Sequence, residues 1–391
     1  MLNHIAPGSV LHPDPAVPER FKSIFDSWGP RVKKTHLCLS ATLVLPFAAL
    51  LAIAGSASIC LAHEPAAAVD LPAMQKAVVA WREALGPELA GKATFAFDDK
   101  RRTDWQFVPM ERDGVNWSEM NLEQRRAAHS LLRTTLSSQG FFKAMTIMSL
   151  EGDLRRMEAD RAGVENIRNP EKYWFAIFGD PASDEPWGWR IEGHHLSLNF
   201  SSVTGQVVSV TPAFFGSNPA ELRDGPRAGL RVLGAEEDLG RELITSCSPE
   251  QRTTAIIAVD APGDVIAMPG LEIKFAEPDG LGADQMTAEQ QALLRRLVDE
   301  LVGNFNPELK DQAWHAIEDA GFDKLHFAWA GSLERGKGHY FRIHGPTLVI
   351  EYDNTQNDAN HAHLVWHSPG NNFGADYLRR HYAESPHHQP N

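Results

Sequence analysis

The sequence predicts an α+β protein of two tandem related halves, each an antiparallel β-meander packed by helices, related by a pseudo-two-fold axis. Three observations lead to this fold class. The composition, with 43% hydrophobic and 23% charged residues in 391, is that of a globular chain long enough for two domains. Similar segments recur in the same order in both parts of the chain. In each part, helical spacing of apolar residues gives way to short strand-like runs.

Three pairs of segments carry the internal similarity. Any one pair could arise by chance, but three pairs in the same order favour a duplicated unit. The matched pairs are residues 87–98 with 249–260, 120–124 with 286–290, and 190–200 with 342–352. The expected organisation is an N-terminal extension and signal peptide at 1–62, a first α+β repeat at 63–225, a second α+β repeat at 226–375 and a C-terminal tail at 376–391.

The N-terminal part predicts export. A basic cluster followed by a long apolar run fills residues 31–62, and the run contains Pro46 and ends in small residues. This pattern is typical of a secretory signal peptide and predicts a periplasmic or secreted protein with no stable membrane span after processing. A retained membrane anchor and a lipoprotein attached through Cys60 are the alternatives. The proline-rich residues ahead of the cluster indicate a translation start near Val32.

Each half is expected to contain an opening helix and then a pair of helices. Apolar residues at helical spacing predict both pairs. Asn121 and Thr287 are matching N-cap candidates, and Gln124 and Gln290 stand three residues on, as a capping box requires. The opening helices are expected at 72–85 and 236–246, and breaks in the helix pairs at Gly140 and 304–307.

Each half is also expected to contain a strand hairpin and then a meander. Short apolar runs bounded by turn residues predict these strands. Gly193-His194 and Gly345-Pro346 fit tight two-residue turns within the meanders. The expected hairpins are 93–97 with 105–108, and 254–259 with 265–268. The expected meander strands are 173–178, 187–191, 196–200 and 207–211 in the first half, and 325–330, 339–343, 348–352 and 361–366 in the second.

Four motifs in these segments, at residues 189–199, 211–219, 357–366 and 373–382, resemble those of a known family. Together they make most of the chain similar to the domain of unknown function 3500 family. The resemblance implies an uncharacterised, commonly exported protein. It implies no activity and no cofactor, so the chemistry must be argued from the residues.

The candidate metal ligands are His361, His363 and His195. Alternate side chains of an extended strand share a face, so His361 and His363 are expected to project imidazoles about 7 Å apart toward one side. Three histidines, or two with a carboxylate, leave an open position that suits a divalent metal, zinc or iron. A solvent-facing polar strand is the alternative interpretation of the same pattern.

The candidate catalytic residues are Glu192, His195 and Glu351. His195 lies in the first meander's turn, where the second half has Thr347, so the turn itself does not require histidine. Glu192 is expected opposite His195, where it can orient the imidazole. Glu351 can supply a metal ligand or a general base. Histidines on the surface of a turn and an ordinary solvated strand face are the alternatives.

Other prominent residues have a structural interpretation. Arg190 and Arg342 match between the halves, which favours a role in the shared fold over a role in one reaction. Cys247 is expected to be a buried apolar residue. The aromatic segment at 214–219 is expected to be a loop that lines a pocket or packs in the core.

The sequence favours a metal-dependent enzyme, a hydrolase or an oxidoreductase, with a histidine-rich cleft between the two halves. A non-catalytic periplasmic or secreted ligand-binding protein is the alternative, and a structural envelope protein is a third. The net charge of −14 argues against a nucleic-acid partner, which would need a basic surface. The expected partner is therefore a small-molecule substrate or ligand, and whether the protein is an enzyme stays open.

Overall fold

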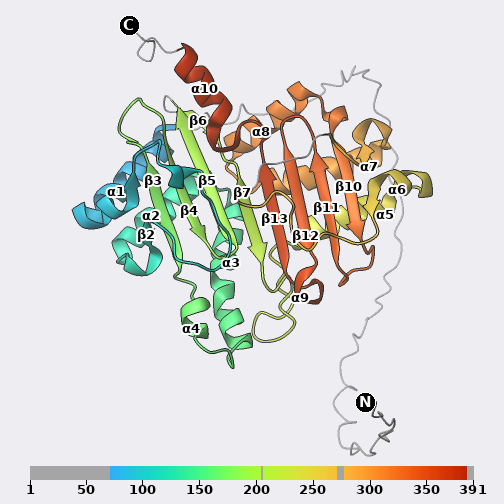
Figure 1. Ribbon diagram of the computed structural model, residues 1–391, viewed down its shortest axis with the longest axis horizontal. Coiled ribbons are helices and arrows are strands. Elements are labelled where there is room, and N and C mark those ends of the chain that lie inside the picture. The colour runs from blue at the N-terminus through green and yellow to red at the C-terminus, as the bar shows by residue number, and fades with distance from the viewer. Residues whose placement is uncertain (1–70, 204–205, 271–276, 385–391) are drawn as a thin grey trace, which may run out of the picture. The chain divides into compact units, whose positions relative to one another are not determined.

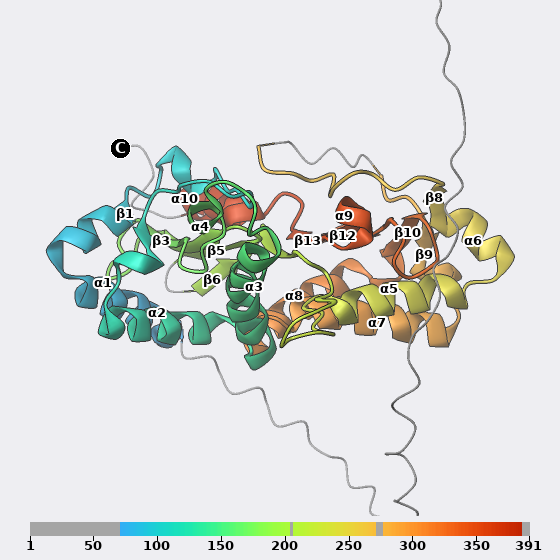
Figure 2. The same ribbon diagram turned by 90° about the horizontal axis from the view of Figure 1, so that it is seen from below.

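The computed structural model describes residues 71–203, 206–270 and 277–384, all of which lie within the unit Ala62–Asn391. These residues form a mixed α/β structure with ten α-helices and one large, mostly antiparallel sheet. Long helices lie along one face of the sheet, and irregular segments cover much of the opposite face (Figures 1 and 2). The predicted signal peptide lies outside the described residues.

The sheet runs without a break through both parts of the chain. Its strand order is β1-β3-β4-β5-β7-β13-β12-β11-β10-β8, with β2 paired to β3, β6 to β5 and β9 to β10. Only β1 and β8 pair in parallel with a neighbour among the described strands. The strands are β1 Thr94–Phe95, β2 Val115–Asn116, β3 Tyr173–Phe178, β4 Trp187–Gly193, β5 Leu196–Val203, β6 Gln206–Ser209, β7 Ala213–Ser217, β8 Ile256–Ala258, β9 Leu281–Gly282, β10 His326–Gly331, β11 His339–His344, β12 Val349–Asn354 and β13 Ala362–His367.

The predicted helices are confirmed, and so are both predicted capping boxes. The Asn121 side chain accepts from the Gln124 backbone, and the Thr287 side chain accepts from the Gln290 backbone. The helices are α1 Leu71–Ala93, α2 Leu122–Thr135, α3 Ser138–Met157, α4 Val164–Ile167, α5 Gly234–Ser246, α6 Pro249–Ala255, α7 Ala288–Val302, α8 Pro307–Ala320, α9 Gln356–Ala359 and α10 Ala375–Glu384. Helix α10 therefore occupies the start of the segment expected to be a tail.

Gly140 does not break a helix, contrary to the prediction. It lies inside the first turn of α3. A Cβ placed there would lie 1.8 Å from the Asn304 carbonyl oxygen, so the glycine permits a close approach of two backbones instead. None of the helices in the described ranges combines the length and the apolar character needed to cross a bilayer.

The two predicted hairpins do not form. The short strands β1 and β8 pair with β3 and β10, and residues 105–108 and 265–268 run as irregular segments over the sheet. Buried carboxylates of the sheet take the backbone donors that a hairpin would have used. Glu192 accepts from the Gln106 N–H at 2.8 Å, and Glu351 accepts from two successive N–H groups, those of residues 266 and 267.

The meander strands form as predicted, but both turns lie one residue further along. In the second, the Gly345 N–H donates to the Leu348 carbonyl at 2.9 Å, so the turn residues are Pro346 and Thr347. In the first, Gly193 pairs with Leu196, so the turn residues are His194 and His195. His195 has a φ of 62°, in the left-handed region. Glu192 pairs with Ser197. The prediction that Glu192 stands opposite His195 is therefore wrong.

The aromatic segment expected to be a loop is a central strand. β7 lies between β5 and β13 and pairs with both. All five of its residues are buried. The aromatic and small residues of β7 lack the polar alternation by which a strand is recognised in a sequence, so the pattern predicted a loop.

The two faces of the sheet differ in chemistry. Leu364 and Trp366 of β13 join the large apolar core beneath the helices. Val365, on the opposite face of β13, packs with Trp105 and Phe214 in a smaller cluster under the covering segments. Because side chains alternate along a strand, His363 shares this second face, where the buried charges lie.

Candidate metal centre

Three histidines converge where β13 meets the turn between β4 and β5. His195 lies in that turn, His361 directly precedes β13, and His363 lies within β13. Gly216 of β7 connects them: it pairs with His363 across the sheet, and its N–H donates to the His195 carbonyl at 2.7 Å. The sheet thus brings together residues far apart in the sequence.

The three imidazoles aim their Nε2 atoms at one point. The Nε2–Nε2 distances are 2.8 Å between His361 and His195, 3.0 Å between His363 and His361, and 3.3 Å between His363 and His195. A metal about 2.0–2.1 Å from each nitrogen places its ligand atoms roughly 2.8–3.4 Å apart for bond angles between a right angle and the tetrahedral value. The observed triangle has the size that such an ion requires, and these three residues can hold a metal.

A carboxylate orients one of the three ligands. His363 Nδ1 donates to Asp264 Oδ1 at 2.6 Å. This hydrogen bond fixes the tautomer that leaves Nε2 with a free lone pair, as in the carboxylate–histidine–metal arrangement. Burial by itself would raise the pKa of Asp264, but the hydrogen bond and charge of His363 lower it overall.

Sequence reasoning missed Asp264. It follows Pro262 and Gly263 in an irregular segment, where no periodic pattern marks it. The one available signal was chemical, since a buried metal-binding imidazole usually needs a partner for its second nitrogen.

His195 is held from several sides. Its backbone N–H donates to the Phe107 carbonyl at 2.9 Å. Its ring stacks on that of His194, with the ring centroids 3.7 Å apart. A Cβ on Gly216 would lie 2.8 Å from Cδ2 of His195. The ring therefore occupies the space that the missing side chain of Gly216 leaves.

The pKa values of two candidate ligands fall well below the ordinary histidine range. Burial, reinforced by the neighbouring histidines, lowers the pKa of His195 strongly. Burial and then the adjacent His363 lower the pKa of His361 to about 3. Both imidazoles are uncharged at neutral pH, so neither must lose a proton before a metal binds.

His194 contacts a second group of buried charges. Its Nδ1 makes a short contact with Glu151 and lies 3.3 Å from a nitrogen of Arg168. Its carbonyl accepts from the Tyr173 hydroxyl at 2.7 Å. These contacts fix the turn that carries His195.

Glu192 and Glu351, which were predicted to be catalytic, bind the irregular segments that cover the sheet. Glu351 accepts from the Tyr340 hydroxyl at 2.7 Å, in addition to two backbone N–H groups. Glu192 pairs with Arg112 at 3.0 Å and accepts from Ser197 at 3.1 Å. Burial raises the pKa of Glu351. A catalytic role for either residue stays a prediction, since these contacts describe an anchoring role.

The matched arginines also hold the covering segments in place. Arg190 donates to the Asp104 carbonyl at 2.9 Å, and Arg342 pairs with Asp279 at 3.2 Å. His367, on the same face of β13 as His363, donates to the Ala267 carbonyl at 3.1 Å. Cys247 is buried, as predicted.

Fold and site together define a mixed α/β protein with a cluster of three histidines that could hold a metal ion. The chain matches the family model described as "Protein of unknown function (DUF3500)" over residues 67–375, and it belongs to that family. Neither the curated proteins nor the solved structures gave a match.

Proposed function

We propose that this protein is a metal-dependent enzyme, a hydrolase or an oxidoreductase, that binds a divalent metal through His195, His361 and His363. The observation that carries the proposal is the convergence of three Nε2 atoms within 3.3 Å of one another. An all-nitrogen set of three imidazoles favours zinc over iron, for which two histidines with a carboxylate are more typical.

The surroundings suit such chemistry. A metal ion bound by three histidines has a fourth coordination position open for water or substrate. Such a metal ion lowers the pKa of its bound water, so that hydroxide is available near neutral pH. Asp264 keeps His363 oriented for coordination. The Phe107 ring packs edge-on against His363 at 5.1 Å and stacks on Phe214 at 4.1 Å, which gives the site an apolar wall. His361 is only partly buried, so we expect substrate to enter on its side.

Metal analysis of protein purified without a histidine tag tests the proposal. We expect stoichiometric zinc or iron in the parent protein and loss of that metal in the double variant His361→Ala plus His363→Ala. His315→Ala, which changes an exposed histidine of α8, is the matched control and should keep the metal. A metal-free parent, or a double variant that binds as well as the control, contradicts the proposal. Bound metal without turnover of any hydrolysable or oxidisable substrate supports the ligand-binding alternative.

We also propose that residues 63–225 and 226–375 descend from one duplicated unit. Supporting this, α1 has a kink at Gly86 before Pro87, where the second part has two helices with Pro249 at the start of the second. Further support comes from the parallel pairs β1–β3 and β8–β10, which flank antiparallel strands in both parts. On this view the metal centre lies at the junction of the halves, because β7 pairs with β13 there.

Co-expression of residues 63–225 and 226–391 as separate chains tests the duplication. Two related units that meet along β7 and β13 should co-purify as a complex and bind metal together. Fragments that remain insoluble or separate would argue for a single indivisible unit.

We propose, finally, that the protein is exported to the periplasm or secreted, on the evidence of the basic and apolar pattern at residues 31–62. Mass spectrometry of the protein recovered from the extracytoplasmic fraction of its own cells should give a mature N-terminus near residue 63. An intact N-terminus on cytoplasmic protein would refute export.

A further inference from the structure

A cavity of about 260 Å³ lies beside His194, the turn residue that precedes the candidate ligand His195. Its wall is built from α3, α4, β3, the turn between β4 and β5, and the irregular segment ahead of β2. None of the three candidate metal ligands lines it. The cavity is therefore distinct from the metal centre, although the two share the turn that carries His194 and His195.

His194 presents an unused nitrogen to this cavity. Its Nδ1 contacts the Glu151 carboxylate, and because a carboxylate accepts and does not donate, this nitrogen carries the hydrogen. Nε2 has no hydrogen-bond partner in the described part of the chain, and it is not one of the polar atoms there that are sealed from solvent. The side chain is only 10% exposed, so its accessible nitrogen faces the cavity that it lines.

The indole of Trp174 supplies a donor on the same wall. Trp174 is 4% exposed, and among the described residues its N–H also has no partner and is not sealed from solvent. The amide of Asn166, an exposed residue of the lining, adds a group that both donates and accepts. Polar groups that are buried without a partner cost free energy, which a ligand that reaches them recovers.

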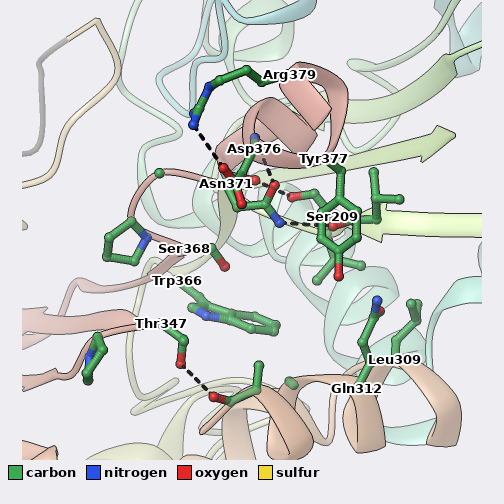
Figure 3. A pocket seen from close by; sticks show the side chains of 17 residues that line it. Ser209, Leu309, Gln312, Thr347, Trp366, Ser368, Asn371, Asp376, Tyr377 and Arg379 are labelled. Atoms are coloured by element: carbon green, nitrogen blue, oxygen red, sulfur yellow. Dashed lines mark hydrogen bonds and ion pairs between the residues drawn. The ribbon is translucent and has the colours of Figure 1, made fainter. Parts of the chain in front are cut away.

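A larger cavity, of about 450 Å³ beside the end of β13, gives a contrast (Figure 3). Its Trp366 N–H is sealed from solvent, so no ligand atom in that cavity can bond to it. Its Asn371 amide donates to the Val208 carbonyl, and its Arg379 pairs with Asp376. The cavity beside His194 differs because two unpartnered nitrogens on its wall can be reached.

The charged groups of the His194 cavity are already engaged with one another. Lys172 pairs with Glu111 at 2.6 Å, and Glu151 contacts His194. A charged ligand would lose water without finding a free counter-charge, which is costly. The wall therefore favours an uncharged ligand with groups that hydrogen-bond.

We propose that this cavity is a second binding site, for an uncharged compound of monosaccharide size that carries several hydroxyl groups. A hydroxyl can donate to Nε2 of His194 and can accept from the Trp174 N–H, whereas a carbonyl or ether oxygen can only accept. The cavity volume suits one small ring, and Met110 and Ile167 supply apolar wall for the C–H groups of that ring. The site goes beyond the metal-dependent reaction proposed above and does not depend on it.

Saturation-transfer NMR titrations of the full chain with glucose, galactose and mannose test this site. EDTA is present throughout, so that coordination of hydroxyl groups to a metal does not contribute. We expect saturable, millimolar binding of at least one of these hexoses. The matching uronic acid has the same ring with a carboxylate added, and it should bind about ten-fold more weakly because the wall has no free cation to pair with it.

A first pair of variants tests the hydrogen bond. Trp174→Phe removes the N–H and should weaken binding of the hexose about five-fold, the factor that one neutral hydrogen bond provides. Trp314→Phe changes an indole of α8 outside the cavity lining, so it is the control and should bind as the parent does.

A second pair locates the ligand. Ile167→Trp fills the cavity from its wall and should weaken binding about ten-fold or more, whereas Ile257→Trp on β8, outside the lining, should leave it unchanged. If Ile167→Trp does not fold, Asn166→Trp fills the cavity from an exposed position. The proposal would be overturned by the absence of saturable hexose binding, by equal or tighter binding of the uronic acid, by parent-like affinity of Trp174→Phe, or by undiminished binding in the filled cavity.

Discussion

Replacing Gly216 with alanine should disrupt the candidate metal centre although no candidate ligand is substituted. The new Cβ would lie 2.8 Å from Cδ2, 2.9 Å from Cγ and 3.0 Å from Cβ of His195. Ordinary van der Waals contact begins at about 3.4 Å, so the ring must move by roughly half an ångström. Metal–ligand distances tolerate about 0.2 Å. The displaced Nε2 therefore leaves the 2.8–3.3 Å triangle that it forms with His361 and His363.

Disturbing the support of a single ligand commonly weakens metal affinity about 10- to 100-fold, and we expect a loss in that range for Gly216→Ala. Competition for zinc with a chromogenic chelator measures it. Gly338→Ala is the control, because a Cβ there would meet its nearest neighbour at 3.7 Å, an ordinary contact. Zinc affinity within two-fold of the parent, in a variant that unfolds at the same temperature as the control, would refute the proposed role of the Gly216 gap.

Substitutions at three further positions test the surrounding network. Asp264→Asn should weaken zinc binding about 10-fold or more in the same competition assay while leaving stability unchanged, and equal affinity would contradict its orienting role. Glu351→Ala leaves two buried donors and one partly buried donor without their acceptor. It should lower the urea unfolding free energy by about 3 kcal/mol, with Glu351→Gln losing less. Burial lowers the pKa of His367 to about 4, below its unfolded value of about 6.5. The unfolded chain therefore takes up the proton first, so stability should fall by up to about 3 kcal/mol between pH 6.5 and 4. His367→Gln should flatten that fall, and an unchanged pH profile would exclude His367 as its source.

The helices and most strands follow from local pattern. Asn121 and Thr287 begin helices because their side chains can accept from backbone N–H groups three residues on, a contact that depends on sequence spacing alone. Several meander strands alternate apolar residues with polar or small ones, because one face packs under the helices and the other carries buried polar groups. β7 lacks this alternation, because its residues are mainly aromatic and small, and the sequence pattern therefore missed it.

The candidate site was only partly accessible from the sequence. The H-x-H pattern at His361 and His363 predicts two imidazoles on one side of a strand, and the unmatched His195 marks a turn that does not need histidine. Asp264 carried no such signal. Its partner His363 is 99 residues away along the chain, and no local rule relates two residues at that separation.

The sequence by itself determined where the chain becomes helical or extended and which residue types are available for chemistry, since backbone preferences and side-chain spacing act within a few residues. Only the tertiary structure decided that Glu192 and Glu351 bind the irregular segments over the sheet instead of contacting the three histidines. It also decided that Gly216 in the central strand β7 leaves room for the imidazole of His195, which lies in the turn between β4 and β5. Both depend on strand order and register, which are set by the packing of the whole sheet and by competition for its buried hydrogen-bond donors.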